Sequence, residues 1–183
     1  MKKIRLIIVA ALAMTLAACG NKSTAPTENA TAKESVGENS SKEVTYITYT
    51  NEKYGFSVEV PAGMVQKGEA MGDEGTVFSA DMDGFALNRI DISGTRQFVD
   101  MDYTPAMVKE EFKYWTANKD IASEECGDDY FTYTTKGEML TEMTYNVYKG
   151  NSAALITIYY DAEHEKQLGG EVARHVFSSV KFK

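Results

Sequence analysis

The sequence has few of the residues that usually build reactive sites. Its 183 residues include two cysteines, Cys19 and Cys126, and two histidines, His164 and His175. It contains no Gly-x-Ser-x-Gly nucleophile elbow, and the glycine-rich stretch 68–75 lacks the Lys-Ser/Thr pair of a phosphate-binding loop. These absences argue against a disulfide-stapled scaffold, a serine hydrolase and a P-loop nucleotide-binding protein.

Basic residues are also scarce. The chain holds 19 Lys and Arg against 27 Asp and Glu, a net charge of −8. Three of the basic residues (Lys2, Lys3 and Arg5) and none of the acidic ones lie in residues 1–18, so removal of that segment leaves 16 against 27, or −11. This balance argues against a nucleic-acid partner and against docking on anionic lipid through the folded protein itself. It favours solubility in an exported domain.

The first 18 residues have the three-part form of a secretory signal. The basic start is followed by an apolar run, 6–18, interrupted only by Thr15. A helix that spans a bilayer core needs about 20 apolar residues, and this run is too short. We therefore expect residues 1–18 to be a cleaved signal peptide and not a transmembrane helix.

The apolar run ends in Leu16-Ala17-Ala18-Cys19-Gly20, which resembles the bacterial lipobox. The resemblance implies cleavage before Cys19 and attachment of a diacylglyceryl group to its thiol, with palmitate among the acyl chains, in a lipoprotein of the cell envelope. Acyl chains contribute about 0.8 kcal/mol per buried CH₂, and two of them anchor stably. Gly20 favours the outer membrane if the organism is Gram-negative. The alternative is an ordinary signal peptide whose Ala-rich cleavage site happens to precede a cysteine.

Residues 20–43 have the composition of a disordered tether. They are rich in Ser, Thr, Asn, Glu, Lys and Ala and contain one Val as their only large apolar residue. Such a segment cannot bury enough surface to offset its conformational entropy. Its expected reach is roughly 25–30 Å. The expected organisation is therefore a signal peptide at 1–18, a lipidated Cys19 with its tether at 19–43, and one domain at 44–183.

Cys126 remains alone once Cys19 carries lipid. It has no Cys-x-x-Cys partner, so an intramolecular disulfide or a thioredoxin-like role is not expected. Two interpretations stay open, a small buried hydrophobe and a free thiol.

Strand patterns dominate residues 44–183. In 56–60, Phe56, Val58 and Val60 alternate with polar residues, and Pro61 then ends the strand. Asp83-Gly84 predicts a hairpin turn between strands 76–82 and 85–93, where Ile90 and Ile92 face away from Arg89 and Asp91. The other strands are expected at 46–50, 130–135, 139–148 and 152–160.

Two helices interrupt these strands. Thr104 is a suitable N-cap before Pro105, and Val108, Phe112 and Trp115 form an apolar stripe. The second helix is expected at 162–178 with Leu168, Val172, Val176 and Phe177 toward the core, and Gly169-Gly170 weakens it to the point where it can break. Because few connections can hold a crossover helix, the pattern predicts an α+β domain with a mainly antiparallel sheet flanked by helices.

The segment 51–64, Asn-Glu-Lys-Tyr-Gly-Phe-Ser-Val-Glu-Val-Pro-Ala-Gly-Met, resembles the opening of PsbP-like domains. The Gly/Asp-rich stretch 68–75 and the ending Ile158-Tyr159-Tyr160, helix and 176–182 are similar to that family too. The resemblance covers about residues 44–183 and implies an α/β/α sandwich around an antiparallel sheet. Members of the family mostly bind partner proteins and are not enzymes. No functional residue of the family can be placed on this sequence, because the matching motifs are structural.

The histidines do not form an obvious site. On one continuous helix, His164 and His175 would share a face but lie about 16 Å apart along the axis. They can share a metal or a proton only if the helix breaks at Gly169-Gly170. A zincin signature starting at His164-Glu165 fails, since position 168 is Leu168. We expect both to be surface residues.

Other candidate sites are weak. Asp81-Met82-Asp83-Gly84 superficially resembles a calcium loop, but position 92 is Ile92 where a Glu is required. Asp73-Glu74, Glu124-Glu125 and Asp128-Asp129 are either solvated turns or a weak Ca²⁺ site. The 11 tyrosines are either ordinary strand residues or a surface that stacks on glycans or peptides.

Two functions follow as expectations. The first is a non-enzymatic, lipid-anchored interaction domain of the cell envelope, with a membrane bound through Cys19, a protein partner, no nucleic acid, no cofactor, no metal and no catalytic residue. The second is a small-ligand or metal-binding accessory protein acting on envelope material. A deep pocket with convergent carboxylates or tyrosines would favour the second.

Overall fold

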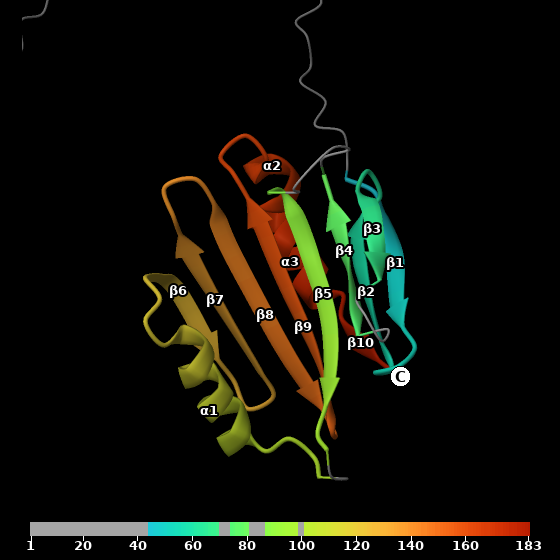
Figure 1. The fold of residues 1–183 in the computed structure, drawn as a ribbon, viewed down its shortest axis with the longest axis vertical. Coiled ribbons are helices and arrows are strands. Elements are labelled where there is room, and N and C mark those ends of the chain that lie inside the picture. The colour runs from blue at the N-terminus through green and yellow to red at the C-terminus, as the bar shows by residue number, and fades with distance from the viewer. Residues whose placement is uncertain (1–43, 70–73, 81–86, 99–100) are drawn as a thin grey trace, which may run out of the picture. The chain divides into compact units, whose positions relative to one another are not determined.

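The computed structural model describes residues 44–69, 74–80, 87–98 and 101–183, and Figure 1 shows their arrangement. The described part contains two antiparallel sheets and three helices. The strands are β1 Tyr46–Asn51, β2 Phe56–Pro61, β3 Val65–Glu69, β4 Gly75–Ser79, β5 Arg89–Arg96, β6 Ile121–Cys126, β7 Tyr130–Lys136, β8 Thr141–Lys149, β9 Ser152–Tyr160 and β10 Lys181–Phe182. The helices are α1 Pro105–Thr116, α2 Glu165–Leu168 and α3 Gly170–Ser178.

The larger sheet has seven strands in the order β3-β4-β5-β9-β8-β7-β6. Strands β6 to β9 form a meander, and β5 then pairs with β9 over its whole length, from Arg89 opposite Tyr159 to Arg96 opposite Ser152. The smaller sheet has the order β1-β2-β10, so the last strand of the chain lies beside the second. All of these pairs are antiparallel.

The main core lies between the large sheet, the small sheet and α3. Successive strand residues point to opposite faces. On β2 the buried residues are Phe56, Val58 and Val60, and they pack with Ile156 and Ile158 of β9. Leu168, Ala173 and Val176 of α2 and α3 close this core. The main core therefore lies on the side of the large sheet where Figure 1 shows α2 and α3.

A smaller core lies on the other face of the large sheet, under α1. The Thr104 hydroxyl caps this helix by accepting a hydrogen bond from the Met107 backbone N–H at 3.3 Å. Val108 is buried against Phe131, Tyr133 and Tyr148. The core is small because α1 lies over the β6–β7 side of the sheet (Figure 1) and contacts those two strands.

The structure confirms the α+β class and the mainly antiparallel sheet. The predicted strands at 46–50, 56–60, 130–135 and 152–160 are all present. The cap at Thr104 is confirmed too. The helix expected at 162–178 is broken at the predicted glycine pair into α2 and α3, and Gly170 takes a positive φ of 53° there.

Several details differ from expectation. Strands β3 and β6 were missed, because β6 has a charged, mostly exposed sequence with no alternation. The strand expected at 85–93 is described only from Arg89, and it extends to Arg96. Trp115 was placed in the apolar stripe of α1 but is 38% exposed, and its ring lies 6.1 Å from that of the exposed Tyr114. The turn at Asp83-Gly84 lies outside the described residues.

Candidate binding surface on the large sheet

Helix α1 covers only part of its face of the large sheet. On this same face, no helix of the described residues lies over the remaining part, which is formed by β5, β9 and the first half of β8 (Figure 1). Polar side chains occupy this part, which we name the open face. With Lys119 and Tyr133, which reach it from the segment after α1 and from β7, its residues are Arg89, Asp91, Lys119, Tyr133, Glu142, Thr144, Thr157 and Tyr159, of which Tyr133 and Thr144 are buried.

Strand register places most of these side chains together. Arg89 of β5 lies opposite Tyr159 of β9, and Tyr159 lies opposite Glu142 of β8. One step along, Thr157 lies opposite Thr144. Because all of them alternate with residues of the main core such as Ile90 and Ile158, they must point to the α1 side of the sheet.

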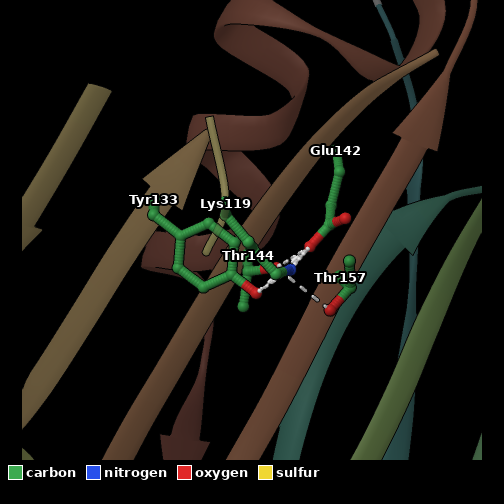
Figure 2. Close-up of polar contacts among 5 residues, drawn as sticks. All are labelled: Lys119, Tyr133, Glu142, Thr144 and Thr157. Carbon is green, nitrogen blue, oxygen red and sulfur yellow. Dashed lines mark hydrogen bonds and ion pairs between the residues drawn. The ribbon is translucent and has the colours of Figure 1, made fainter. Parts of the chain in front are cut away.

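Lys119 reaches the open face from outside the sheet. It follows α1 after a turn in which Asn118 has a φ of 62°, and its backbone N–H donates to the Thr116 carbonyl at 3.2 Å. Figure 2 shows its ammonium group among the polar side chains of three strands. Nζ lies 2.6 Å from Glu142 Oε1 and 2.8 Å from the Tyr133 hydroxyl.

Glu142 is the shared acceptor of this network. The Tyr133 hydroxyl donates to its Oε1 at 3.1 Å and the Thr144 hydroxyl at 3.4 Å. Thr144 and Thr157 face each other at 3.3 Å between their hydroxyl oxygens (Figure 2). Burial by itself would lower the pKa of Lys119, but the hydrogen bonds to Glu142 and Tyr133 outweigh it and raise the pKa. The amine therefore stays protonated and is not a nucleophile.

A second ion pair lies on the far side of Tyr159. Arg89 Nε is 2.9 Å from Asp91 Oδ1, and the Arg89 guanidinium carbon is 4.2 Å from the centre of the Tyr159 ring. Burial raises the pKa of Asp91, and the hydrogen bond from Arg89 opposes the rise. Burial also raises the pKa of Tyr159, and Glu142 and Asp91 add to the effect. The open face thus carries two pairs of opposite charges around a neutral tyrosine.

The two histidines lie apart from the open face, each with its own carboxylate. His164 Nδ1 is 2.8 Å from Asp161 Oδ1, and His175 Nε2 is 2.7 Å from Glu59 Oε2. The His175 ring also stacks on Tyr46 at 3.8 Å between centres. The break between α2 and α3, which could have brought them to one site, does not do so.

The acidic turns also fail to form a site in the described residues. Within that part of the chain, no three His, Cys, Asp or Glu side chains are placed to hold a metal ion. Glu74 instead lies 3.8 Å from Lys53, and Asp128 lies 3.4 Å from Lys109. Asp73 and the loop Asp81-Met82-Asp83-Gly84 lie outside the described residues.

Of the two cysteines, Cys126 is in the described part of the chain and Cys19 lies outside it. Cys126 is half-buried at the end of β6, and its thiol donates to the Gly127 carbonyl at 3.7 Å. Burial raises the pKa of this thiol, Lys109 lowers it and Asp128 raises it again. A thiol in that state is a poor nucleophile. Among the described helices, none is long and apolar enough to span a bilayer.

Sequence reasoning anticipated part of the open face. The alternation in 85–93 put Arg89 and Asp91 on the side opposite Ile90 and Ile92. It did not indicate Lys119, because that residue depends on the turn after α1 and on a contact with Glu142 of a distant strand. The tyrosine surface considered from composition is represented here by Tyr133, which is buried, and Tyr159, which is half-exposed.

Comparison with known proteins reveals likeness at the level of fold. No protein-family model matches the sequence, and no curated protein matches it. Among solved structures, the cyanobacterial PsbP (CyanoP) of Synechocystis sp. PCC 6803 has a TM-score of 0.53 at 12% identity, over 81% of this chain and 99% of that one. The Ran-binding protein Mog1p of Saccharomyces cerevisiae has a TM-score of 0.51 at 10% identity, over 76% of this chain and 96% of that one.

A third similar structure is a longer protein from Bacteroides thetaiotaomicron. Its TM-score is 0.50 at 14% identity, over 74% of this chain, and this chain spans about half (48%) of that protein's length. At these identities the comparisons establish the architecture that the sequence resemblance implied, and function has to come from the residues.

Proposed function

We propose that this chain is a lipid-anchored lipoprotein of the cell envelope whose domain binds a protein partner through the open face and is not an enzyme. The binding role rests on one observation. Two ion pairs, Arg89–Asp91 and Lys119–Glu142, lie on a sheet face that no described helix covers.

The anchor is supported by the sequence around Cys19. A basic start, a short apolar run and Leu16-Ala17-Ala18-Cys19 occur in the order that a lipidated precursor requires. Two acyl chains on Cys19 would hold the chain to the membrane, and the polar segment 20–43 would let the domain reach partners at roughly 25–30 Å. Gly20 favours the outer membrane in a Gram-negative organism.

A binding role fits the chemistry of the open face better than a catalytic one. Its lysine is kept charged by hydrogen bonds to Glu142 and Tyr133, and Tyr159 is kept neutral by burial and nearby carboxylates. None of these groups is an activated nucleophile or a base poised near neutral pH. Charged groups that are half-buried and already ordered by their neighbours bind with little loss of side-chain freedom.

A protein is the partner that this surface suits. Charges of both signs come from β5, β8 and the segment after α1, so they select a partner with the complementary arrangement and repel a uniformly charged polymer. Tyr159 lies at their centre, and tyrosine is among the residues that contribute most at protein interfaces. The yeast protein of similar fold is a Ran-binding protein, which offers a precedent for protein binding on this architecture.

Site-specific photocrosslinking tests the binding face. A photoreactive phenylalanine would replace Tyr159 in the full chain expressed in its own organism, and the matched control would replace Tyr114, which is 78% exposed on α1. We expect one crosslinked protein from position 159 and a loss of that product when Arg89→Glu is added. A product from position 114 alone, or one that survives Arg89→Glu, would contradict the assignment.

Membrane extraction tests the anchor separately. We expect wild type to stay with membranes through a detergent-free wash and Cys19→Ser to be released. Retention of Cys19→Ser in the membrane fraction would refute lipid attachment at Cys19 and would leave the crosslinking result untouched. Cys126→Ser is the matched control and should stay membrane-bound.

A further inference from the structure

A cavity of about 410 Å³ opens at the end of the domain where the chain terminates. In Figure 1 this is the lower end, where β5 ends, β8 turns into β9 and the C-terminus lies. Strand β1 begins at the other, upper end. The residues that matter for its chemistry are Tyr54, Arg96, Asp102, Lys149, Ser152 and Lys183. Another cavity, of about 380 Å³, lies on the other side of Tyr54 and Arg96, which line both.

The walls of this cavity are held by backbone hydrogen bonds between segments that lie far apart in the sequence. In the turn between β8 and β9, the Gly150 carbonyl accepts from the Tyr103 N–H at 2.7 Å, and the Asn151 carbonyl accepts from the Gln97 N–H at 3.0 Å. The Gly55 carbonyl accepts from the Lys183 N–H at 2.8 Å. A cavity with walls fixed in this way needs little reorganisation to bind a ligand.

Arg96 is oriented toward the cavity by three contacts. Its Nε donates to the Ser152 hydroxyl at 3.3 Å, its Nη2 donates to the Lys53 carbonyl at 3.2 Å, and its guanidinium carbon lies 6.0 Å from the centre of the Tyr54 ring. None of these contacts is with a carboxylate. Arg96 is therefore a positioned cation that retains N–H donors for a ligand.

Lys149 is a second cation without a carboxylate. Among the described residues its amino group makes no hydrogen bond or ion pair. Lys183 adds no net charge, because its Nζ lies 2.5 Å from Glu52 Oε2. Asp102 is the acidic side chain on the cavity wall and opposes the two cations. Arg96 and Lys149 against Asp102 thus leave one net positive charge among the side chains of the cavity wall, in a chain whose net charge is −8.

We propose that this cavity is a binding site for a phosphate ester, with Arg96 and Lys149 holding the phosphate. Arginine matches phosphate oxygens with paired N–H donors and lysine adds a point charge. The cavity has room for the alcohol part of a small ester beside the phosphate, since pockets for small molecules begin at about 300 Å³. Tyr54 and Ser152 would lie against that part. This site is separate from the open face and does not depend on it.

The source of the phosphate ester is either a soluble metabolite or a lipid headgroup, and two probes separate them. Full-length protein in neutral detergent would be titrated by calorimetry with glycerol 3-phosphate and with a short-chain, water-soluble phosphatidylglycerol, and glycerol would serve as the uncharged control. We expect saturable binding of a phosphate probe and none of glycerol. The probe that binds more tightly identifies the source.

Variants connect the binding to the cavity. Arg96→Gln and Lys149→Gln should each weaken the phosphate probe by about tenfold, and Lys113→Gln, an exposed lysine on α1, should leave it unchanged. Asp102→Asn should tighten binding, because it removes the opposing charge. Circular dichroism and the melting temperature would show that each variant is folded.

Three outcomes would overturn the proposal. They are a failure of both phosphate probes to bind, an equal loss in Lys113→Gln, and a weakening by Asp102→Asn, which would mean that the ligand presents a cation. None of them would bear on the crosslinking from position 159.

Discussion

The Lys119 ammonium group lies 2.6 Å from Glu142 Oε1 although the two residues come from different sides of strand β7. Their side chains are 31% and 22% exposed, so water screens the pair less than it screens the surface pair Lys109–Asp128, with side chains 54% and 79% exposed. The contact fastens the segment after α1 to the large sheet. It connects the edge of the smaller core to the open face.

This pair should contribute measurably to stability. We expect Lys119→Met and Glu142→Gln each to lower the free energy of unfolding by roughly 1–2 kcal/mol, because each change leaves a half-buried polar group without its charged partner. The double variant should lose less than the sum, with a coupling of about 1 kcal/mol. Urea denaturation of the four proteins measures it. Strict additivity would show that the two groups do not interact in solution.

Two buried asparagines should respond to the same substitution with opposite signs. Asn146 is 1% exposed, and among the described residues no partner lies in hydrogen-bonding geometry with its amide nitrogen or its amide oxygen. Asn88 is 3% exposed, and its side chain donates to Asp161 Oδ2 at 3.1 Å and accepts from the Asp161 N–H at 2.9 Å. Asn146→Leu should stabilise the domain by roughly 1 kcal/mol, since it removes an unsatisfied buried amide. Asn88→Leu should destabilise it by roughly 2–3 kcal/mol.

Thermal unfolding of both variants measures the difference in one experiment. The substitutions are of similar size, so packing changes affect the two sites alike and hydrogen bonding separates them. A loss of stability in Asn146→Leu comparable to that in Asn88→Leu would mean that Asn146 is satisfied in solution.

The fold was more predictable than the surface, for a physical reason. Strand and helix signals are local, so the alternation in 56–60 and the cap at Thr104 could be read directly. The break between α2 and α3 followed from adjacent glycines. Strand β6 carried no such signal, because its charged residues suit a sheet edge that is mostly exposed.

The candidate sites depend on contacts between segments far apart in sequence. Arg96 meets Lys149 at one cavity because β5 pairs with β9, and no spacing in the sequence records that pairing. The net charge of the whole chain argues against nucleic acid and against docking on anionic lipid, but it does not say where single cations gather, such as Arg96 and Lys149 at one cavity. The metal candidates show the converse, because among the described residues the acidic turns and the two histidines are not gathered into a site although some are adjacent in sequence.

Acid should weaken the domain partly through Asp161. A hydrogen bond with His164 and another from Asn88 lower the pKa of this carboxyl from 3.8 to about 2. A carboxyl whose pKa is lowered by folding stabilises the folded state fully when the pH is above its ordinary pKa of 3.8. That contribution is lost as the pH falls through about 2. The free energy of unfolding of wild type should therefore fall more steeply between pH 4 and pH 2 than that of Asp161→Asn. His164→Gln should give an intermediate slope, and equal slopes for all three proteins would contradict the assignment.

Tyr54 lies against β5 because residue 94 has no side chain. A Cβ on Gly94 would come within 2.3 Å of the Tyr54 ring, whereas one on Gly63 would meet nothing within 4 Å. Gly94→Ala should cost roughly 1–3 kcal/mol of stability, as overpacking does, and Gly63→Ala should be neutral or slightly stabilising. Because Tyr54 lines both cavities beside Arg96, Gly94→Ala should also weaken any phosphate ester bound there. Urea denaturation and the calorimetric titration measure the two effects on the same samples. A Gly94→Ala protein with wild-type stability would show that Tyr54 moves away from β5 without cost.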